Sequence, residues 1–595
     1  MQAGISSWRI ATSIWTFSLL ANVDPLSYGS DTTALSSVVA SMLAICQIIG
    51  MLPTSAIYRK VIWAFALIPL ASYSSARTSI IMADLRAQTF DHPGNTHPVE
   101  SLIATARLNY EELVTRQSRD FDAASAEYRR RYGMEPPPGF EGWFELAISH
   151  NSSIIDDFDA MHGSVSPFWR LSGLEVLESM KEAYATQNSE LWRCSFSSGS
   201  AKTSCRHKHR SFDRHIASEF DDRMASLKGK LPDVTFLVNH FDEATVLVPP
   251  LSRMPGDDFD KDPFRMTYMS KTSIWDAITN FCTPETRSND RPLKQYKDTS
   301  GLFFVTNCSF ATDLCQHSEF SSLHGFLQSP TSFRLFEGLV PIMSTSAPSV
   351  MGDILFPSPA YSEDEFQYDE SRDEDWAKKR NELYWTGSTT GGFAHDDGWS
   401  AFHRQRFVTM VENTDHKQRY FYLEEEEGQS RLRISSFLNR RLFNVGFTNV
   451  VGCDRKHCRD QRTFFNLRAW ADKDEALGSR LGFDIDGNGI SGRYYKLLAS
   501  KSAPFKMTIF REWHDDRLVP WYHYIPVSLS MEELPELVMY FTSTESGRRR
   551  AEEIASQGRE WYSKAFRDVD KTIYLYRLFL ELARLQDPAR EATDQ

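Results

Sequence analysis

A glycine-broken turn, DIDGNGISGR over residues 484–493, carries residue types that are suited to binding a phosphate group. Its three glycines allow backbone N–H groups to approach an anion closely, and they are Gly487, Gly489 and Gly492. The run that follows predicts a helix over residues 493–500, which places Arg493 in the first turn. A diphosphate there would meet free N–H groups, the positive end of the helix dipole and a guanidinium. The spacing therefore predicts an anion site.

The same turn also matches the start of a calcium-binding loop. The matching residues, at positions 1, 3, 5 and 6 of such a loop, are Asp484, Asp486, Asn488 and Gly489. Position 12 is Tyr495, where a bidentate Glu is needed, so we predict no calcium site. A metal-binding acid pair is a second interpretation, but two acids in a turn are more often turn formers. The sequence assigns no metal ligand and leaves the metal requirement open.

A second glycine-rich loop follows a predicted strand that begins at Leu383. The segment LYWTGSTTGG ends in a loop over residues 387–392 that resembles a phosphate cradle, because glycine lets N–H groups approach an anion. A helix predicted over residues 399–411 then carries Arg404 and Arg406. Arginine contacts phosphate in a bidentate manner and keeps its charge, and Arg404 is the better-placed candidate.

Polar side chains cluster at the predicted end of a buried strand over residues 234–238. They are Asn239, His240, Asp242 and Glu243. Because α/β proteins place their chemistry at the carboxyl ends of strands, this cluster is a candidate for the reacting groups. A glycoside hydrolase needs a facing pair of carboxylates, whereas Asp242 and Glu243 are neighbours and point to opposite faces of a strand. The pattern therefore argues against a hydrolase.

The elements that must position these residues belong to a chain of 595 residues, which predicts two globular units plus an appendage. The net charge of -13 argues against a nucleic-acid partner, because phosphate backbones are bound by excess Lys and Arg. Residues 166–230 read as polar helices, and their basic patch at 206–214 is interpreted as a solvated face without a site. An acidic segment at 362–378 predicts a linker between the units.

Three apolar runs near the amino terminus are candidates for transmembrane helices: residues 10–23, 34–52 and 61–76. The second run is uncharged for 19 residues, which is long enough to span a bilayer. The basic residues before the first run and between the second and third place residue 1 in the cytosol and the chain beyond about residue 80 on the other side. A cleaved signal peptide, or apolar helices packed on the protein, are the alternatives. We expect up to three transmembrane helices.

Cysteine usage fits an oxidising compartment for that side of the membrane. One cysteine, Cys46, lies in an apolar run, and the other seven are Cys194, Cys205, Cys282, Cys308, Cys315, Cys453 and Cys458. The short spacings 194/205, 308/315 and 453/458 could each close a loop, although the sequence fixes no connectivity, and an odd number leaves one thiol free. Zinc is disfavoured because the chain has no CxxC pair. Asn151 and Asn307 begin glycosylation sequons, which fit a luminal or secreted domain.

Six segments resemble the fungal branch of glycosyltransferase family 90. They are PPPGFEGW, LVNHFDEATVLVPP, DILFPSP, YWTGSTTGG with HRQRF, DGNGISGRYYKLLAS and REWHDDRLVPWYHYIPV, and together they cover about residues 130–590. The family includes capsule-type β-1,2-xylosyltransferases, and animal protein O-glucosyltransferases are more distant members. The resemblance implies an α/β fold of the GT-B type, with two facing Rossmann-like domains and a nucleotide sugar in the cleft, here preceded by the transmembrane helices.

With this resemblance the chain is predicted to have five parts. They are a membrane anchor over residues 1–80, a stem and helical region over 81–230, an acceptor-side Rossmann-like domain over 231–375, a donor nucleotide-sugar domain over 376–570, and a C-terminal helix and tail over 571–595.

The resemblance also implies roles for individual residues. Asp242 matches the family's catalytic aspartate, the general base of an inverting transfer. Ser388 matches the serine after a Trp-x-Gly element. Arg404 falls near the family's phosphate arginine, and the extra residues at 391–399 leave Arg406 open. The second nucleotide-binding turn supplies Gly489, Ser491, Gly492 and Arg493.

Glu512 aligns with the acid of the family's Glu-Trp pair. Since it follows a further apolar strand, we infer a contact with the ribose of the nucleotide. His523 and Trp521 are interpreted as structural residues. The sequence departs from the family at Ala244, because fungal relatives often carry a proline or arginine after the two acids, but Asp242 itself is kept.

These observations predict a glycosyltransferase of the Golgi or endoplasmic reticulum membrane, with a luminal catalytic domain. It would transfer a sugar, with xylose from UDP-xylose favoured, to a hydroxyl of a glycan or glycoprotein. The alternatives are a UDP-glucose-dependent protein O-glucosyltransferase and a non-catalytic, membrane-anchored glycan-binding protein. The sequence does not determine the donor sugar, the acceptor, the linkage or the oligomeric state.

Overall fold

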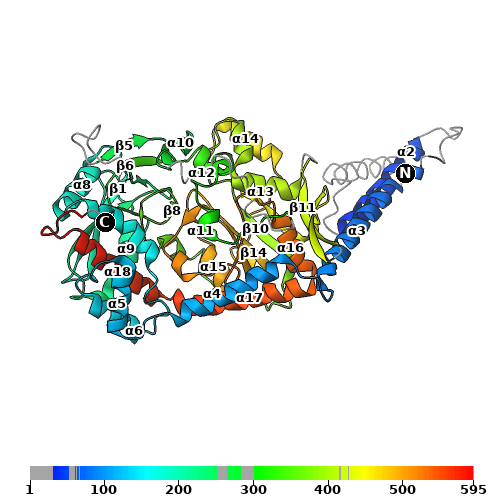
Figure 1. Ribbon diagram of the computed structural model, residues 1–595. Coiled ribbons are helices and arrows are strands. Elements are labelled where there is room, and N and C mark those ends of the chain that lie inside the picture. The colour runs from blue at the N-terminus through cyan, green and yellow to red at the C-terminus, as the bar shows by residue number, and fades with distance from the viewer. Residues whose placement is uncertain are drawn as a thin grey trace.

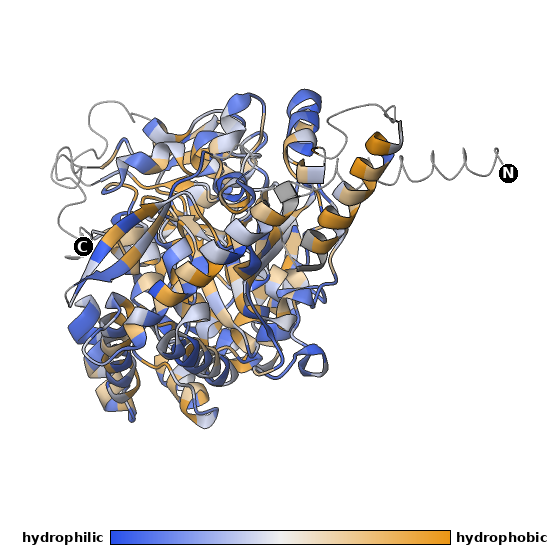
Figure 2. Ribbon diagram, turned by 90° about the vertical axis from the view of Figure 1, so that its right-hand side faces the viewer, coloured by the Kyte–Doolittle hydropathy of each residue, from blue (hydrophilic) through white to orange (hydrophobic). Residues whose placement is uncertain are grey.

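Two five-stranded sheets form the body of the protein (Figure 1). The computed structural model describes residues 31–51, 61, 63–65, 67–250, 264–282, 301–413, 417–426 and 428–593. Within these ranges the fold is mixed α/β, and three smaller sheets of two or three strands accompany the two large ones. Figure 2 shows hydrophobic residues on the central strands and on a helix that extends from the body, with many hydrophilic residues on the outer surface.

The first sheet, the core of the first half of the molecule, lies between residues 191 and 355 and has the strand order β2-β1-β3-β7-β9. The strands are β1 (Leu191–Ser197), β2 (Lys202–Arg206), β3 (Val234–Asn239), β7 (Ile342–Ser344) and β9 (Ile354–Leu355). Strand β1 runs antiparallel to both β2 and β3, whereas β3, β7 and β9 are parallel. The hairpin of β1 and β2 forms within the segment 166–230, which the sequence analysis interpreted as helical.

The second sheet is parallel throughout and has the strand order β13-β10-β14-β15-β17. The strands are β10 (Arg380–Ser388), β13 (Phe443–Asn449), β14 (Ser479–Ile485), β15 (Ala503–Met507) and β17 (Ile525–Pro526). Every residue of β15 is buried, as expected for a central parallel strand covered on both faces. The helices that contact this sheet are α13 (His403–Glu412), α15 (Tyr494–Ala499), α16 (Leu534–Ser543) and α17 (Glu545–Ala565).

Contacts between the halves of the molecule include a short strand pair and a stacked histidine pair. Strand β16 (Phe510–Arg511) of the second half pairs with β8 (Ala347–Pro348) of the first. The ring of His324, from the first half, stacks on that of His403 in α13 with centroids 3.7 Å apart.

The remaining strands form the sheet β4-β6-β5 and the hairpin β11-β12. Their bounds are β4 (Val246–Leu247), β5 (Phe264–Tyr268), β6 (Arg334–Gly338), β11 (Tyr420–Glu426) and β12 (Gln429–Ser435).

The other helices lie around both halves of the molecule, and the last helix of the chain packs on the first sheet (Figure 1). The bounds are α4 (Pro98–Thr115), α5 (Phe121–Tyr132), α6 (Phe140–Ser149), α7 (Asp159–Val165), α8 (Gly173–Ala185), α9 (Ile216–Met224), α10 (Trp275–Ile278), α11 (Cys308–Ala311), α12 (Gly325–Gln328), α14 (Arg455–Phe464) and α18 (Asp568–Leu585). Helix α18 contacts α6, α9 and β3, so the chain returns to its first half before it ends.

The predicted N-terminal transmembrane helices are corrected by the structure. Helices α2 (Asp31–Met51) and α3 (Leu67–Ala87) lie side by side and extend away from the body (Figure 1). In the described part of the chain no helix has both the length and the apolar character that crossing a bilayer requires. For α3 the reason lies in its composition, because it extends past the apolar run and carries Arg77, Asp84 and Arg86. The first predicted run, residues 10–23, lies outside the described residues.

The fold prediction was also wrong about two Rossmann-like domains. The structure is mixed α/β with several sheets, and the antiparallel hairpin at the edge of the first sheet replaces a βαβ crossover there.

Three disulfides form among the described cysteines. A disulfide between Cys194 and Cys205 links facing residues of the β1–β2 hairpin. Two further disulfides join Cys282 to Cys315 and Cys453 to Cys458. Cys308 is free, so its short spacing to Cys315 does not mark a bond.

Candidate active site

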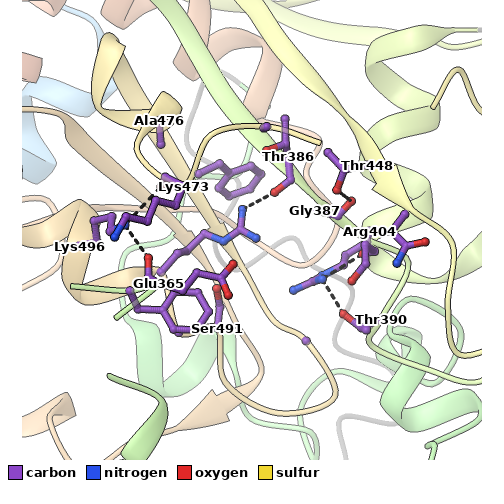
Figure 3. A pocket seen from close by; sticks show the side chains of 18 of the residues that line it. Glu365, Thr386, Gly387, Thr390, Arg404, Thr448, Lys473, Ala476, Ser491 and Lys496 are labelled. Atoms are coloured by element: carbon purple, nitrogen blue, oxygen red, sulfur yellow. Dashed lines mark hydrogen bonds between the residues drawn. The ribbon is translucent and has the colours of Figure 1, made fainter. Parts of the chain in front are cut away.

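A pocket of about 570 Å³ lies at the carboxyl edge of the second sheet (Figure 3). Its floor is formed by residues at the ends of three parallel strands: Thr386 to Ser388 of β10, Thr448 and Asn449 of β13, and the turn after β14. Asp242, which follows β3 of the first sheet, lines the pocket as well. The pocket therefore lies between the halves of the molecule, at the position where open α/β sheets bind ligands.

Arg493 is the N-cap residue of α15 and projects into this pocket. Its Nη1 donates to the carbonyl of Thr386 at 2.7 Å (Figure 3). Its guanidinium carbon lies 5.6 Å from the centre of the Trp385 ring. Burial lowers the pKa of this guanidinium from its usual value. The predicted helix over 493–500 is confirmed as α15, and Arg493 stands directly before it.

Arg404 of α13 lines the pocket beside Arg493. Its donors are bound to three backbone carbonyls and a hydroxyl: Asp486 O at 2.7 Å, Ser388 O and Ile485 O at 3.0 Å, and Thr390 Oγ1 at 2.6 Å. Its guanidinium carbon also lies 5.6 Å from the Trp385 ring. Burial, with a further contribution from the positive charge of Arg493, lowers the pKa of Arg404 to about 9. In contrast, Arg406 donates to Leu323 O and Leu529 O and does not line this pocket.

The two guanidiniums share one feature that matters for binding. Among the ion pairs of the described residues, none within 4.0 Å joins Arg404 or Arg493 to a carboxylate. Arg404 is buried, Arg493 is half-buried at the pocket wall, and both rest against the same indole ring. Acidic groups such as Asp484 act on the two guanidiniums from beyond ion-pair distance, so a bound anion would add a direct counter-charge. The arrangement fits a diphosphate.

The other predicted residues of the donor turn surround this pair. Ser388, Ser491 and Gly492 line the pocket. Gly492 lies against the ring of Phe366, and a Cβ added at position 492 would come within 2.6 Å of that ring. A side chain there would force the Phe366 ring to move. The glycine is thus required by a close approach.

Asp242 and Gly489 bring the two halves into direct contact. Gly489 does not line the pocket itself, but a Cβ added there would lie 2.3 Å from the carbonyl oxygen of Asp242. Asp242 is half exposed, and its Oδ1 forms an ion pair with Arg214 Nη2 at 2.8 Å. Arg214 belongs to the basic patch at 206–214, which the sequence analysis interpreted as having no site. The structure brings Arg214 to the predicted base.

Glu243 points away from the pocket, as expected for a neighbour of Asp242. Only 3 % of Glu243 is exposed, and Oε1 accepts the N–H groups of Thr331 and Ser332 at 3.0 Å each. Burial, together with the charge of Asp242, raises the pKa of Glu243 to about 7. The two carboxylates therefore have different functions: Asp242 faces the pocket and Glu243 holds a neighbouring turn.

Glu512 is not brought to this pocket. It is buried, accepts a hydrogen bond from Tyr361 Oη and lies 3.1 Å from Lys506 Nζ. Lys506 also lies 3.3 Å from Asp484, so Glu512 belongs to a buried charge cluster behind the strand ends. The inferred contact of Glu512 with a ribose has no support from this placement.

Several lining residues were missed by sequence reasoning. Glu365 and Phe366 come from the acidic segment that was interpreted as a linker, and Trp470 and Lys473 come from the loop after α14. Lys496 of α15 donates to Glu365 O at 2.6 Å, which ties that segment to the pocket wall (Figure 3). Trp470 is 78 % exposed, an unusual position for a large aromatic ring. That exposure depends on tertiary structure, so no sequence pattern could reveal it.

The acid pair that the sequence analysis weighed as metal ligands, Asp484 and Asp486, does not line the pocket. Asp484 pairs with Lys506, and Asp486 is buried, with its pKa raised to about 8 by that burial. In the described part of the chain, the ligand atoms of one group, Asp397, His457 and Asp460, lie within 4.8 Å of one another. The ammonium of Lys456 lies 3.2 Å from His457 Nε2. A positive charge already stands where a cation would bind, and we assign no metal to this group.

Comparison with protein-family models indicates the class of protein to which this site belongs. Residues 426–594 match the model described as glycosyl transferase family 90. The match contains the donor turn and α15 but not Asp242, Ser388 or Arg404, and it covers less than a third of the chain. No curated protein matches the chain. The family match supports the resemblance found in the sequence, and it supports a glycosyltransferase as the class of protein. Such a class suggests a nucleotide-sugar donor and a glycan acceptor.

Proposed function

We propose that this protein is an inverting glycosyltransferase that uses a UDP-sugar and has Asp242 as its general base. The observation that carries the proposal is the pair Arg404 and Arg493, two guanidiniums without a carboxylate partner in the described part of the chain, in a pocket that Asp242 also lines. The family match over residues 426–594 supports the same class. A non-catalytic glycan-binding protein would need neither the guanidinium pair nor the facing carboxylate.

The donor side of the pocket would bind the diphosphate. Arg404 and Arg493 carry charge that a diphosphate neutralises, and the N–H groups of the glycine turn lie beside them. When the sugar is transferred, negative charge grows on the diphosphate oxygen that leaves. The same two guanidiniums would stabilise this charge, because they are held in place by backbone carbonyls before the reaction begins.

Asp242 would act on the acceptor. The hydroxyl oxygen of the acceptor attacks the anomeric carbon, and the bond from that carbon to the diphosphate oxygen breaks with its electron pair going to the leaving UDP. The hydroxyl proton passes to the Asp242 carboxylate. Arg214 occupies Oδ1 of Asp242, and among the hydrogen bonds of the described residues none engages Oδ2, which leaves that oxygen to take the proton.

For the donor sugar we propose xylose, with transfer to a glycan or glycoprotein hydroxyl. The support is the resemblance of the six sequence segments to the fungal branch of family 90. We also propose an oxidising compartment of the secretory pathway, the lumen of the Golgi or endoplasmic reticulum. Three disulfides and the exposed sequon residues Asn151 and Asn307 support this compartment.

The test is a panel of UDP-sugars incubated with the full chain, with and without divalent cation. UDP-xylose, UDP-glucose, UDP-galactose and UDP-N-acetylglucosamine are compared by UDP release and by transfer to a mixture of methyl glycosides. We expect UDP-xylose to give the fastest turnover. Faster turnover with UDP-glucose would contradict the pentose and keep the transferase. Absence of UDP binding in calorimetry, with no turnover of any donor, would overturn the proposed function.

A further inference from the structure

A second cavity, of about 700 Å³, lies at the other end of the same sheet edge. It is lined by Thr508 after β15 and by Val527 and Leu529 after β17, whereas the first pocket uses β10, β13 and β14. None of the described residues lines both spaces. The remaining walls come from α4, α7 and the segment 305–313 around α11. The cavity is thus a separate site built from distant parts of the chain.

Three carboxylates in its wall are each held by one oxygen only. Asp515 Oδ2 accepts the N–H of Glu512 at 3.0 Å, and Asp516 Oδ2 accepts that of Ala160 at 2.8 Å. Asp313 Oδ1 accepts the N–H of Cys315 at 3.0 Å. The hydrogen bonds of the described residues leave the second oxygen of each carboxylate without a donor. Three acceptors are therefore oriented by the backbone and available to a ligand.

Asp515 is the most accessible of these groups. Its side chain is exposed, although protein surrounds it on the sides away from the cavity. This poor solvation, together with the charge of Glu512, raises the pKa of Asp515 to about 7. A carboxylate that is open to a cavity but poorly hydrated forms strong hydrogen bonds with ligand hydroxyl groups.

The positive groups in the wall are held by protein acceptors, although the buried Nε of Arg511 has no partner among the described residues. Lys506 Nζ lies 3.1 Å from Glu512 and 3.3 Å from Asp484. Arg511 Nη2 donates to Met351 O at 2.7 Å. The uncommitted acceptors disfavour an anionic ligand such as a phosphate, and the two fixed cations disfavour a cationic one. The electrostatics therefore favour a neutral ligand that is rich in hydrogen-bond donors.

The rest of the lining fits the two kinds of surface on a sugar ring. Hydroxyl and amide side chains provide donors and acceptors: Asn109, Thr306, Asn307, Ser309, Thr312 and Ser349. Apolar side chains provide surface for the C–H faces of a ring: Val305, Leu518, Pro520, Pro526, Val527 and Leu529. Mixed apolar walls with a few placed polar groups are typical of small-molecule sites.

We propose that this cavity binds a neutral sugar unit of a glycan, separately from the pocket that contains Arg404 and Arg493. The inference goes beyond the proposed function, because it needs neither a nucleotide nor a transfer step. A protein with both sites would bind a glycan at a position away from the reacting groups. The ligand class is set by the free carboxylate oxygens, the engaged cations and the apolar wall.

The experiment is saturation-transfer NMR with the full chain in the presence of saturating UDP, which occupies the first pocket. The probes are the methyl glycosides of xylose, mannose, galactose and glucose, with spermidine as the cationic comparison. We expect millimolar binding of at least one methyl glycoside that UDP does not displace. Binding of spermidine alone, displacement of every glycoside by UDP, or no binding would each overturn the proposal.

Two variants locate the binding. Asp515→Asn keeps an acceptor for the N–H of Glu512 and removes the charge, so we expect glycoside affinity to fall about tenfold. Thr312→Trp fills the cavity and should abolish binding. Asp276→Asn, at an exposed aspartate that lines neither space, is the matched control. Unchanged glycoside affinity in Asp515→Asn would refute the site even if Thr312→Trp fails to fold. UDP affinity, measured alongside, distinguishes this result from failure of the proposed function.

Discussion

The two large sheets contribute differently to the pocket between them. The second sheet is parallel, and its strand ends supply the glycine turns, while α13 and the N-cap of α15 supply the guanidiniums of Arg404 and Arg493. The first sheet is mixed, and one residue after its strand β3, Asp242, reaches the pocket. One half is thus built to bind an anion and the other presents a carboxylate. The comparison indicates that binding and proton transfer can be disrupted independently.

Asp242→Asn should separate these contributions most clearly. The substitution removes the proton acceptor, so we expect transfer to fall by about 1,000-fold. UDP affinity should stay the same, since Asp242 lies on the other wall from the guanidinium pair. Initial rates with UDP-sugar and calorimetry with UDP measure the two quantities. Transfer within a few-fold of the unchanged protein would remove Asp242 as the base.

Glu243→Gln, a substitution in the first half of the molecule, should change how the free energy of unfolding depends on pH. The ordinary pKa of 4.5 rises to about 7 on folding, so the folded state keeps a proton that the unfolded state releases. Stability is therefore lost as pH rises from about 4.5 to about 7, by up to ~3 kcal/mol for this group. In the Gln variant that loss should disappear from the urea midpoints measured across this range.

The comparison for that experiment is Glu141→Gln, at an exposed glutamate of α6. Both curves are measured relative to the unchanged protein, because other buried acids, such as Asp353 with its pKa raised to about 6 by burial, also contribute to the slope. Parallel curves for Glu243→Gln and the unchanged protein would mean that folding does not shift the pKa of Glu243.

Arg493→Ala should weaken UDP binding and leave the proton acceptor Asp242 unchanged. Loss of one charge-assisted contact costs about 2 kcal/mol, so we expect UDP affinity to fall about 30-fold. Arg459→Ala, at an exposed arginine of α14, is the control. Equal UDP affinity for the two variants in calorimetry would show that the diphosphate does not bind beside Arg493.

Gly489→Ala tests the contact between the halves. The added Cβ would lie 2.3 Å from the carbonyl of Asp242, so the turn and the strand end must separate. We expect a loss of about 2 kcal/mol in stability, and a lower transfer rate than loss of folded protein explains. Gly163→Ala in α7 has open space around its Cβ and should cost less. Identical melting temperatures for the two variants would contradict the close approach.

Local patterns were sufficient for the binding half of the site. Strand β10 and the turn before α15 are marked by an apolar run or by glycines within a few residues of one another, and both were predicted. The strand before Asp242 was found in the same way. Arg214 could not be found, since its meeting with Asp242 depends on how the β1–β2 hairpin and α9 pack.

Side-chain direction was the other limit of sequence reasoning. Glu512 was expected to face a ribose, yet it turns into the buried cluster with Lys506. The acidic segment looked like a linker, although Phe366 packs on Gly492 and lines the pocket. The apolar runs predicted membrane helices, but the helices that form have different bounds and include charged residues such as Arg77. In each case the outcome depends on contacts between segments that are distant in the sequence.

The return of α18 to the first half has a consequence for biosynthesis. Its Phe579 packs on Phe236 of β3 with ring centroids 4.9 Å apart, and Ile573 O accepts a hydrogen bond from Trp143 of α6. While the ribosome is still making the second half, the core around β3 lacks the helix that closes it. The strand that ends beside Asp242 can be fully packed only after the last part of the chain has emerged. Packing of the first half therefore depends on synthesis of α18, which follows the second half in the sequence.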